Sequence, residues 1–336
     1  MTDGLFSRRS KVWLCYLAII IMTLIVRIGF SFGTTLNDTE IDVVFSTVVQ
    51  IVIFGIVPVT LYSLTVSKNL KTTFADFGFK KTSGLNWLRC IAIGILMTFS
   101  ATFISIVWHV LLNLIGFKYS PSDTDYSTVG MLFLQIFITA ILPGFFEETT
   151  HRGLLFAAFT PAEKKKNKWL VVIVSALMFS LMHQNIRQTG YTFYDGIILA
   201  LMCYYTGSIF PSMTVHFLNN FSSVLSGYAE QNDGALYGFV NSFYDFLTSN
   251  LLGLLIFTAL FALAVTLIVL LFKDMKREYK KKELLEKVKD FDPFGDLIED
   301  ETAFVGIDPK RDVYAIITVV LGVVVTLFTL VWGILR

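Results

Sequence analysis

Leu251–Phe272 reads LLGLLIFTALFALAVTLIVLLF, 22 consecutive residues without a charged side chain. A helix needs about 20 apolar residues to cross the hydrocarbon core of a bilayer, so this stretch predicts a membrane-spanning helix. The whole chain has the same character, because 54% of its 336 residues are hydrophobic and only 16% are charged. Soluble domains carry about 25% charged residues. The composition therefore indicates an integral membrane protein that crosses the bilayer several times.

Further apolar windows recur along the chain and predict about nine spans in all. They lie near residues 12–32, 43–66, 87–117, 129–159, 169–183, 196–206, 208–227, 250–272 and 313–335. The sixth and seventh windows are the least regular, since Gly207 and Pro211 favour a broken or tightly connected pair. We expect an all-α fold, a polytopic transmembrane helical bundle with a polar cavity inside the membrane.

The windows divide the chain into three parts. Residues 1–127 hold the N-terminal transmembrane helices, 128–230 a candidate catalytic core, and 231–336 the C-terminal transmembrane helices. The last part includes a charged segment at 273–312. We interpret this segment as a solvated cytoplasmic helix and linker rather than as a regulatory site.

Basic residues predict the orientation in the membrane. Lys and Arg gather at residues 8–11, 68–81, 164–168 and 273–289. With nine spans, all four clusters fall on one side, and cytoplasmic connections carry the excess of Lys and Arg. We therefore expect a multi-pass protein with a cytoplasmic N-terminus. A net charge of +1 gives no indication of a nucleic-acid partner, so the expected surroundings are the lipid bilayer.

Four ionisable residues, Glu147, Glu148, His151 and Arg152, lie in FFEETTHRG at residues 145–153, inside the fourth window. Such side chains are rare at membrane depth and mark functional sites. On a helix, Glu148 and Arg152 stand four residues apart on one face and can neutralise each other, either for structure alone or in support of a reaction. Glu147 then points about 100° away from Glu148. It lies outside that ion pair and is able to act as a base.

Two histidines follow on later windows. His183 closes FSLMH, and His216 opens HFLNN, which places Asn220 on the same helical face as His216. Peptide hydrolysis needs a base that activates water and donors that stabilise the developing oxyanion. A glutamate, two imidazoles and an amide supply those groups. We expect the cavity that they line to open to the cytoplasm.

The ordered motifs EExxxR at 147–152, FxxxH at 179–183 and HxxxN at 216–220, on successive hydrophobic helices, resemble the CPBP family of intramembrane endopeptidases. This family is also called the Abi or CAAX-protease family. It includes the eukaryotic Ras-converting CAAX endopeptidase and bacterial proteins linked to bacteriocin processing or immunity. The resemblance covers about residues 132–225.

The resemblance implies a role for each motif residue. Four residues would be catalytic: Glu147, His183, His216 and Asn220. Glu147 and His183 would activate the attacking water, and the other two would stabilise the oxyanion. Three residues would support the site: Glu148, Arg152 and Phe179. The first two would brace it, and Phe179 would pack beneath it.

The need for a metal stays open at this point. Glu147, His183 and His216 are possible zinc ligands, because two imidazoles and a carboxylate leave one coordination position open. No HExxH helix is present in the sequence. The architecture known for the family favours a glutamate mechanism that requires no cofactor. We interpret His109 and His151 as structural.

The function that these residues predict is an intramembrane endopeptidase that cuts a membrane-associated peptide or protein substrate. An alternative is a non-catalytic membrane scaffold or bacteriocin-immunity factor that retains the protease fold. A third possibility is a transporter with a proton relay at membrane depth, but no inverted repeat is visible. The prenylated CAAX tail belongs to one branch of the family, so substrate identity does not follow from the resemblance.

Overall fold

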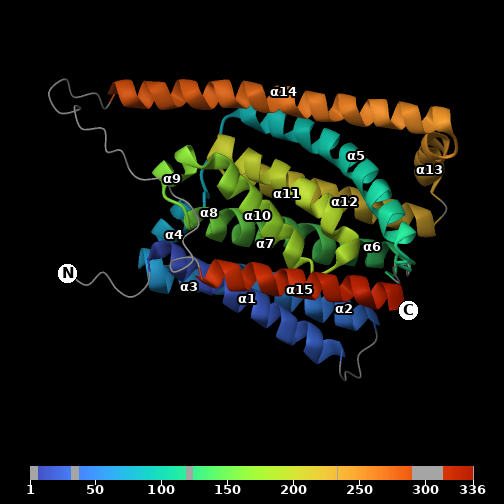
Figure 1. The fold of residues 1–336 in the computed structure, drawn as a ribbon, viewed down its shortest axis with the longest axis horizontal. Helices are drawn as coiled ribbons and strands as arrows, with labels where there is room; N and C mark the ends of the chain where they lie inside the picture. The colour runs from blue at the N-terminus through green and yellow to red at the C-terminus, as the bar shows by residue number, and fades with distance from the viewer. Residues whose placement is uncertain (1–6, 32–37, 119–123, 233, 290–312, 336) are drawn as a thin grey trace.

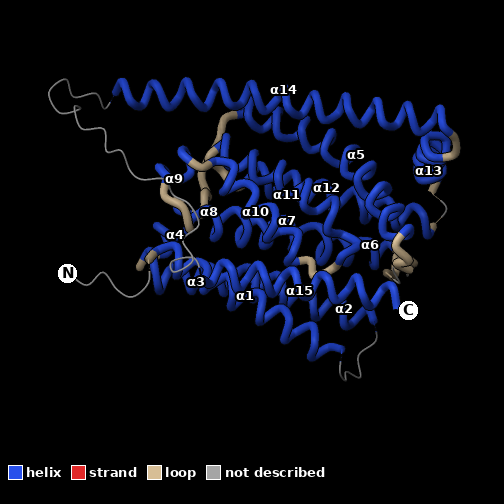
Figure 2. The backbone as a smooth tube through the Cα atoms, in the orientation of Figure 1, coloured by secondary structure: helices blue, strands red, loops and turns tan. Residues whose placement is uncertain are grey.

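The computed structural model describes residues 7–31, 38–118, 124–232, 234–289 and 313–335. Every regular element within these ranges is a helix, which confirms the all-α fold. The long helices run in roughly the same direction and form a bundle (Figure 1). Short connections join most of them, as Figure 2 shows for the core of the bundle.

The N-terminal part combines single helices with one long composite helix. Its elements are α1 (Arg8–Ser31), α2 (Asp38–Thr47), η1 (Val48–Ile56), α3 (Val57–Tyr62), η2 (Ser63–Ser67), α4 (Leu70–Asp76) and α5 (Gly84–Leu114). The run from α2 to η2 has no gap, and η1 and η2 are π-helical. Ser83 caps α5 by accepting a hydrogen bond from the backbone N–H of Asn86. This cap ends the basic loop and begins the helix.

The core part contains a second composite helix and three further long helices. Its elements are α6 (Val129–Gln135), η3 (Ile136–Ile141), α7 (Leu142–Glu148), η4 (Thr149–Leu154), α8 (Leu155–Ala157), α9 (Pro161–Lys166), α10 (Lys168–Met182), α11 (Ile186–Thr206) and α12 (Phe210–Gln231). The composite helix from α6 to α8 continues through Pro143 without a break. The π-helical η3 precedes this proline, whose nitrogen has no hydrogen to donate.

Two glycines fix how the core helices meet. Gly207 has φ +64° and ends α11, so α12 turns back beside it after a short connection. This confirms the predicted tight connection between the sixth and seventh windows. Gly196 lets α11 approach α10, because a Cβ there would lie 2.8 Å from Cα of Ala176.

The C-terminal part wraps the bundle on two sides. It consists of α13 (Ala235–Thr248), α14 (Leu251–Lys289) and α15 (Val313–Leu335). In Figure 1, α14 runs along the top over α5, and α15 lies beside α1 at the bottom. The core helices α7, α10, α11 and α12 lie between these layers. They are therefore shielded from lipid on both sides.

The charged segment at 273–312 is only partly described. Residues up to Lys289 continue α14 as a helix, and residues 290–312 lie outside the described ranges. This extension is attached to the bundle, because Arg89 of α5 pairs with Asp274 and Glu278. Lys165 likewise lies 3.1 Å from Glu283.

Among the residues that the structure describes, six helical runs are long and apolar enough to cross a membrane, so the predicted number of nine is not confirmed. They cover Arg8–Phe30, Val43–Ser67, Gly84–Leu114, Val129–Ala157, Leu251–Leu285 and Val313–Leu335. The three other predicted windows are also helices, namely α10, α11 and α12. However, α10 has only 15 residues, and α11 and α12 carry polar residues that interrupt their apolar character.

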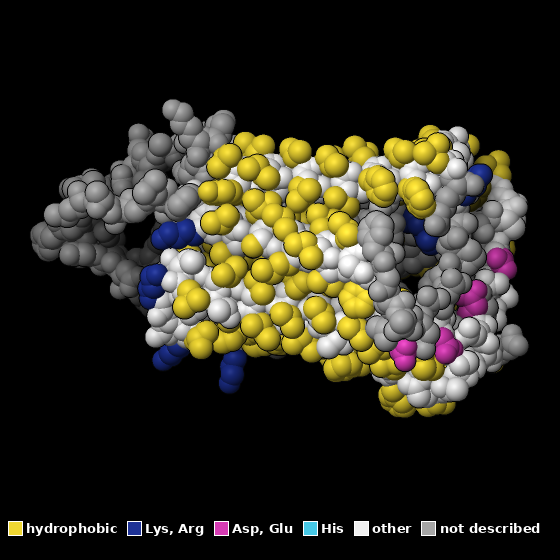
Figure 3. Space-filling model, turned by 90° about the horizontal axis from the view of Figure 1, so that it is seen from below, with side chains coloured by type: hydrophobic (Ala, Val, Ile, Leu, Met, Phe, Trp, Pro, Cys, Tyr) yellow, Lys and Arg dark blue, Asp and Glu magenta, His cyan; other side chains and the backbone are white. Residues whose placement is uncertain are grey.

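Large apolar side chains cover the outside of the bundle. Leu88, Leu251 and Phe328 are more than 60% exposed and belong to three different helices. Figure 3 shows hydrophobic side chains spread over the middle of one face, with Lys and Arg at the left end and both Asp or Glu and further Lys or Arg side chains at the right end. An apolar belt between polar ends is the surface of an integral multi-pass membrane protein.

Candidate active site

The predicted ion pair of the first motif forms at the centre of the core. Glu148 Oε1 accepts a hydrogen bond of 2.6 Å from Arg152 Nη1, and both side chains are fully buried. Arg152 Nη2 also donates to the carbonyl oxygen of Gly196, at 3.1 Å. A buried ion pair with a further hydrogen bond satisfies charges that would otherwise be costly in the interior. The pair therefore links the composite helix to α11.

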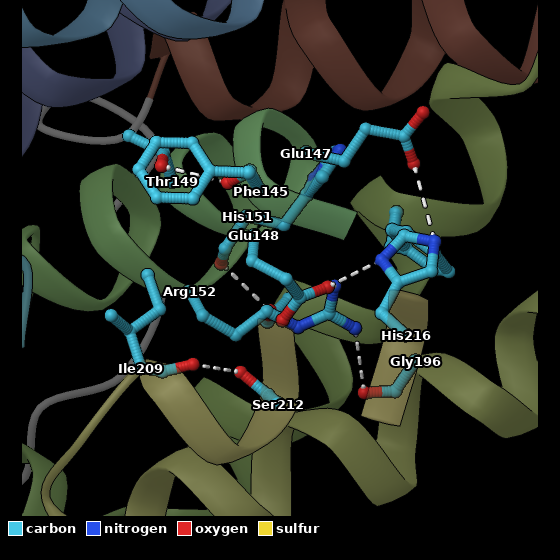
Figure 4. A network of polar contacts seen from close by, with 12 residues as sticks. Phe145, Glu147, Glu148, Thr149, His151, Arg152, Gly196, Ile209, Ser212 and His216 are labelled. Carbon is cyan, nitrogen blue, oxygen red and sulfur yellow. Dashed lines mark hydrogen bonds and ion pairs between the residues drawn. The ribbon is translucent and has the colours of Figure 1, made fainter. Parts of the chain in front are cut away.

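His216 of α12 lies between the two glutamates (Figure 4). Its Nδ1 stands 3.0 Å from Glu148 Oε1, and its Nε2 stands 3.9 Å from Glu147 Oε2. A carboxylate accepts hydrogen bonds, so the closer contact places a hydrogen on Nδ1. The Nε2 atom is then directed toward Glu147 at a separation that is too long for a direct hydrogen bond.

Glu147 is not the unpartnered carboxylate that the sequence indicates. Gln50 of η1 donates a hydrogen bond of 2.7 Å from Nε2 to Glu147 Oε1, across 97 positions of sequence. The side chain of Glu147 is nevertheless outside the Glu148–Arg152 ion pair, as predicted. Gln50 therefore holds Oε1 of Glu147, and Oε2 faces His216.

Phe179 of α10 lies beneath the polar residues and contacts several of them. Its ring packs edge-on against the rings of His183 and His216, with centroids 5.0 Å and 5.4 Å away. The guanidinium carbon of Arg152 stands 4.4 Å from its centroid, a cation–π contact. Both predicted histidines therefore meet at one ring, although they stand at different distances from the starts of their helices.

His183 is oriented by the end of its own helix. Its Nδ1 lies 2.8 Å from the carbonyl oxygen of Phe179. A carbonyl oxygen only accepts hydrogen bonds, so Nδ1 carries the hydrogen and Nε2 has the lone pair. This tautomer makes His183 Nε2 an acceptor beside Glu147, which lines the same cavity.

Asn220 is held by a carbonyl group that lacks its usual partner. Thr139 lies four residues before Pro143, and proline has no N–H to complete the α-helical hydrogen bond. Asn220 Nδ2 donates to the Thr139 oxygen at 3.0 Å. An amide nitrogen carries two hydrogens, so the second remains to be donated elsewhere. Asn220 shares a cavity with His216, but no direct contact joins these two side chains in the structure.

The predicted catalytic residues line one cavity of about 360 Å³. They are Glu147, His183, His216 and Asn220. A second cavity of about 530 Å³ adjoins it along α11 and is lined by parts of α5, α11 and α12. Its lining includes His109 from the last turns of α5 and Arg187 from the first turn of α11. These turns lie at the end of the bundle away from the basic loops.

His151 has a structural position. It is buried in the composite helix, and its Nδ1 lies 2.7 Å from the hydroxyl oxygen of Tyr16. Its ring packs edge-on against Phe179 at 5.2 Å. Through these contacts His151 connects α1 to Phe179 of the site.

The predicted zinc ligands do not form a metal site in this arrangement. In the described part of the chain, no group of three or more His, Cys, Asp or Glu side chains is arranged to hold a metal ion. Glu147, His183 and His216 line one cavity without converging on a common point.

Residues 129–222 match a protein-family model described as type II CAAX prenyl endopeptidase Rce1-like. This match confirms the resemblance to the CPBP family. The Rce1-like segment, residues 129–222, contains all of the residues that the three motifs nominate. Neither the curated proteins nor the solved structures gave a match to the chain. At the level of the family, the match supports a CAAX-type membrane protease that acts on a peptide or protein in a lipid bilayer.

Gln50 lies outside the Rce1-like segment and was not predicted from the sequence. It is nevertheless a polar residue inside the apolar run VVQIVIFGI at residues 48–56. The same argument that selects Glu147, a polar group at membrane depth, selects it. The role of Thr139 has a weaker signal in the sequence, namely its position four residues before Pro143.

Proposed function

We propose that the protein is an intramembrane endopeptidase that hydrolyses a membrane-associated peptide or protein tail with water activated by Glu147 and His183. One observation carries the proposal. The two nitrogens of His216 face two different glutamates, and only Glu148 is neutralised by Arg152. The braced glutamate therefore orients the imidazole, and the other glutamate remains beside it for proton transfer.

In the reaction, a water molecule stands between Glu147 and Nε2 of His183. Its oxygen attacks the scissile carbonyl carbon while Glu147 takes a proton, which is general base catalysis. Asn220 donates its second Nδ2 hydrogen to the oxyanion, and His216, protonated at Nε2, provides the other donor. Glu147 then passes the proton to the leaving nitrogen as the C–N bond breaks.

The supporting residues act by position. Glu148 accepts the hydrogen bond from His216 Nδ1 and so fixes the orientation of the imidazole ring. Arg152 balances the charge of Glu148, and Phe179 keeps both imidazole rings in place by edge contacts. No step of this mechanism passes through a metal.

We also propose the orientation that the basic loops predict, with the N-terminus in the cytoplasm. The support is the clustering of Lys and Arg in the loops at residues 68–81 and 164–168, with the left end of the face in Figure 3 showing Lys and Arg but no Asp or Glu.

The test uses the full-length protein in nanodiscs and a library of internally quenched peptides. We expect wild type to cleave part of the library, and Glu147→Gln to lower kcat by about 10²- to 10⁴-fold, the usual contribution of a general base. Glu230→Gln, an exposed glutamate near the end of α12, is the matched control and should cleave as wild type does.

Two results would contradict the proposal. Activity that a chelator removes and zinc restores would assign the reaction to a metal site instead. A folded wild type that cleaves nothing, together with a Glu147→Gln variant that keeps the cellular phenotype, would favour the scaffold or immunity factor.

A further inference from the structure

One buried carboxylate beside the site has no part in the mechanism above. Asp195 of α11 is 4% exposed, and its Oδ1 atom is buried without a hydrogen-bond partner among the described residues. An ionised carboxylate in such surroundings is costly unless a compensating group approaches it. The backbone next to it is fixed, because Arg152 donates to the carbonyl oxygen of Gly196.

Asp195 stands where the two cavities meet. It lines both the cavity of about 360 Å³ that holds the catalytic residues and the neighbouring cavity of about 530 Å³. Five residues are common to the two linings: Gln188, Tyr191, Asp195, Asn219 and Ser223. A peptide that passes from one cavity into the other therefore passes Asp195.

The charges of the lining favour a cation at this point. In the smaller cavity, the acidic lining residues are Glu147 and Asp195, and the described lining includes neither Lys nor Arg. His216 also lines this cavity, but its two nitrogens face Glu147 and Glu148 rather than Asp195. Arg152 is close by, but its charge is balanced by Glu148. In the larger cavity, Arg187 lies two turns before Asp195 on α11, about 12 Å along the helix axis. A cationic group in either cavity is therefore attracted to Asp195.

We propose that Asp195 is a subsite for a cationic side chain, Lys or Arg, of the peptide substrate. The proposal rests on the proposed function, because the cation would lie a few residues from the bond that is cut in the adjoining cavity. A charge-assisted hydrogen bond to the buried carboxylate oxygen would stabilise the bound peptide. Both cavities have volumes within the range of ligand sites.

Paired peptides test the subsite directly. Full-length protein in nanodiscs of uncharged phosphatidylcholine would receive quenched nonapeptides with Lys, or its uncharged isostere norleucine, at one position at a time. We expect kcat/KM to be about 10- to 100-fold higher for Lys than for norleucine at one fixed position. In Asp195→Asn this ratio should fall to about 1, and in Asp195→Glu it should stay above 1. Asp245→Asn, which removes an exposed carboxylate of α13, should keep the wild-type ratio.

A binding measurement separates failure of the subsite from failure of the protease. Immobilised Glu147→Gln protein would be exposed to the pooled peptides, and mass spectrometry would identify those that it retains. We expect enrichment of Lys or Arg at one position, lost in Glu147→Gln/Asp195→Asn. Cleavage with a wild-type ratio near 1 would overturn the subsite while the proposed function stands.

Absence of cleavage with Asp195-dependent enrichment would support the subsite and reject the protease. Neither cleavage nor Asp195-dependent enrichment would reject both. An unchanged ratio in folded Asp195→Asn would also overturn the subsite. If Asp195→Asn does not fold, as judged by size-exclusion chromatography, the wild-type ratio and the Asp195→Glu ratio decide the question.

Discussion

At the scale of single residues, the site depends on which neighbour donates a hydrogen bond to each of the two glutamates. Glu147 and Glu148 are adjacent in the chain, yet one accepts from Gln50 and the other from Arg152. The difference follows from the helical period, which turns successive side chains by about 100°. One glutamate thus serves structure, and the other is available for proton transfer.

Gln50 provides a test of that division. Replacing Gln50 with Leu removes the hydrogen bond to Glu147 Oε1 and leaves the other contacts of the site in place. We expect kcat to fall by about 10- to 100-fold with little change in KM, because a misplaced catalytic group mainly affects the chemical step. Steady-state kinetics on the best cleaved peptide measures both constants. A rise in KM alone would show that Gln50 contacts the substrate rather than Glu147.

The buried ion pair predicts a large effect on stability. In Arg152→Leu, Glu148 keeps His216 but loses its cation, so we expect a loss of about 3 kcal/mol or more in the free energy of unfolding. The double variant Glu148→Leu/Arg152→Leu should be less destabilised, because no buried charge is left unpaired. Unfolding in mixed detergent micelles gives the values.

A pair of the same spacing whose lysine is exposed to solvent is the control for this comparison. Lys282 lies 2.8 Å from Glu278 on α14, with the lysine side chain 57% exposed. Exposed pairs contribute about 0–1 kcal/mol, so Lys282→Leu should change stability little. If Arg152→Leu were as mild as Lys282→Leu, the pair at the centre of the site would not be a determinant of stability.

At the scale of elements, the predicted membrane spans agree with the structure where the sequence is continuously apolar. They differ where polar residues interrupt the apolar run. The runs around Leu251 and Val313 contain no interruption over most of their length, and both are long helices as expected. The helices α11 and α12 also form, but their polar residues keep them below the apolar content of a membrane span. The sequence pattern of a single helix does not show whether other helices surround it. The partly polar α11 and α12 lie among apolar helices, and this was not visible from their own sequences.

The three motifs predict which core side chains come together but not how distant parts of the chain complete the site. Glu148 and Arg152 are related by local helical geometry, so their contact follows from the sequence. Gln50 reaches Glu147 only because η1 packs on α7, a tertiary contact without a local signal. Asp195 was likewise not predicted, because it lies just before the apolar window at residues 196–206.

The close crossing of α10 and α11 is a property of these two elements and predicts a packing effect. In Gly196→Ala, the new methyl group would lie 2.8 Å from Cα of Ala176, so the helices must separate. We expect a loss of about 1–3 kcal/mol in stability and a weaker hydrogen bond from Arg152 to the carbonyl oxygen of residue 196. Thermal unfolding in nanodiscs, followed by circular dichroism, measures the change.

Gly238 of α13 is the matched control, since a Cβ there meets nothing within 4 Å. Gly238→Ala should leave stability unchanged or raise it by about 0.5–1 kcal/mol, because alanine favours the helix. Equal losses for the two variants would attribute the effect at residue 196 to something other than the crossing.

At the scale of the whole molecule, two features bear on the side from which substrate enters. They are the positions of the basic loops and of the cavities. The basic loops lie at the end where α5 and α10 begin. The larger cavity extends toward the end where α5 finishes and α11 begins. With the N-terminus in the cytoplasm, a peptide that reaches Asp195 through this cavity would come from the opposite side of the membrane or from within the bilayer.

Cysteine labelling in intact cells decides this orientation. Cys15, Cys90 and Cys203 are buried and would first be replaced by Ala. We expect a membrane-impermeant maleimide to label Glu230→Cys, near the end of α12, and to label Lys81→Cys only after the cells are opened, because Lys81 lies in a basic loop. The reverse pattern would place the basic loops outside, and the larger cavity would then extend toward the cytoplasm. Either result fixes the side on which a cationic peptide must be offered to the protein.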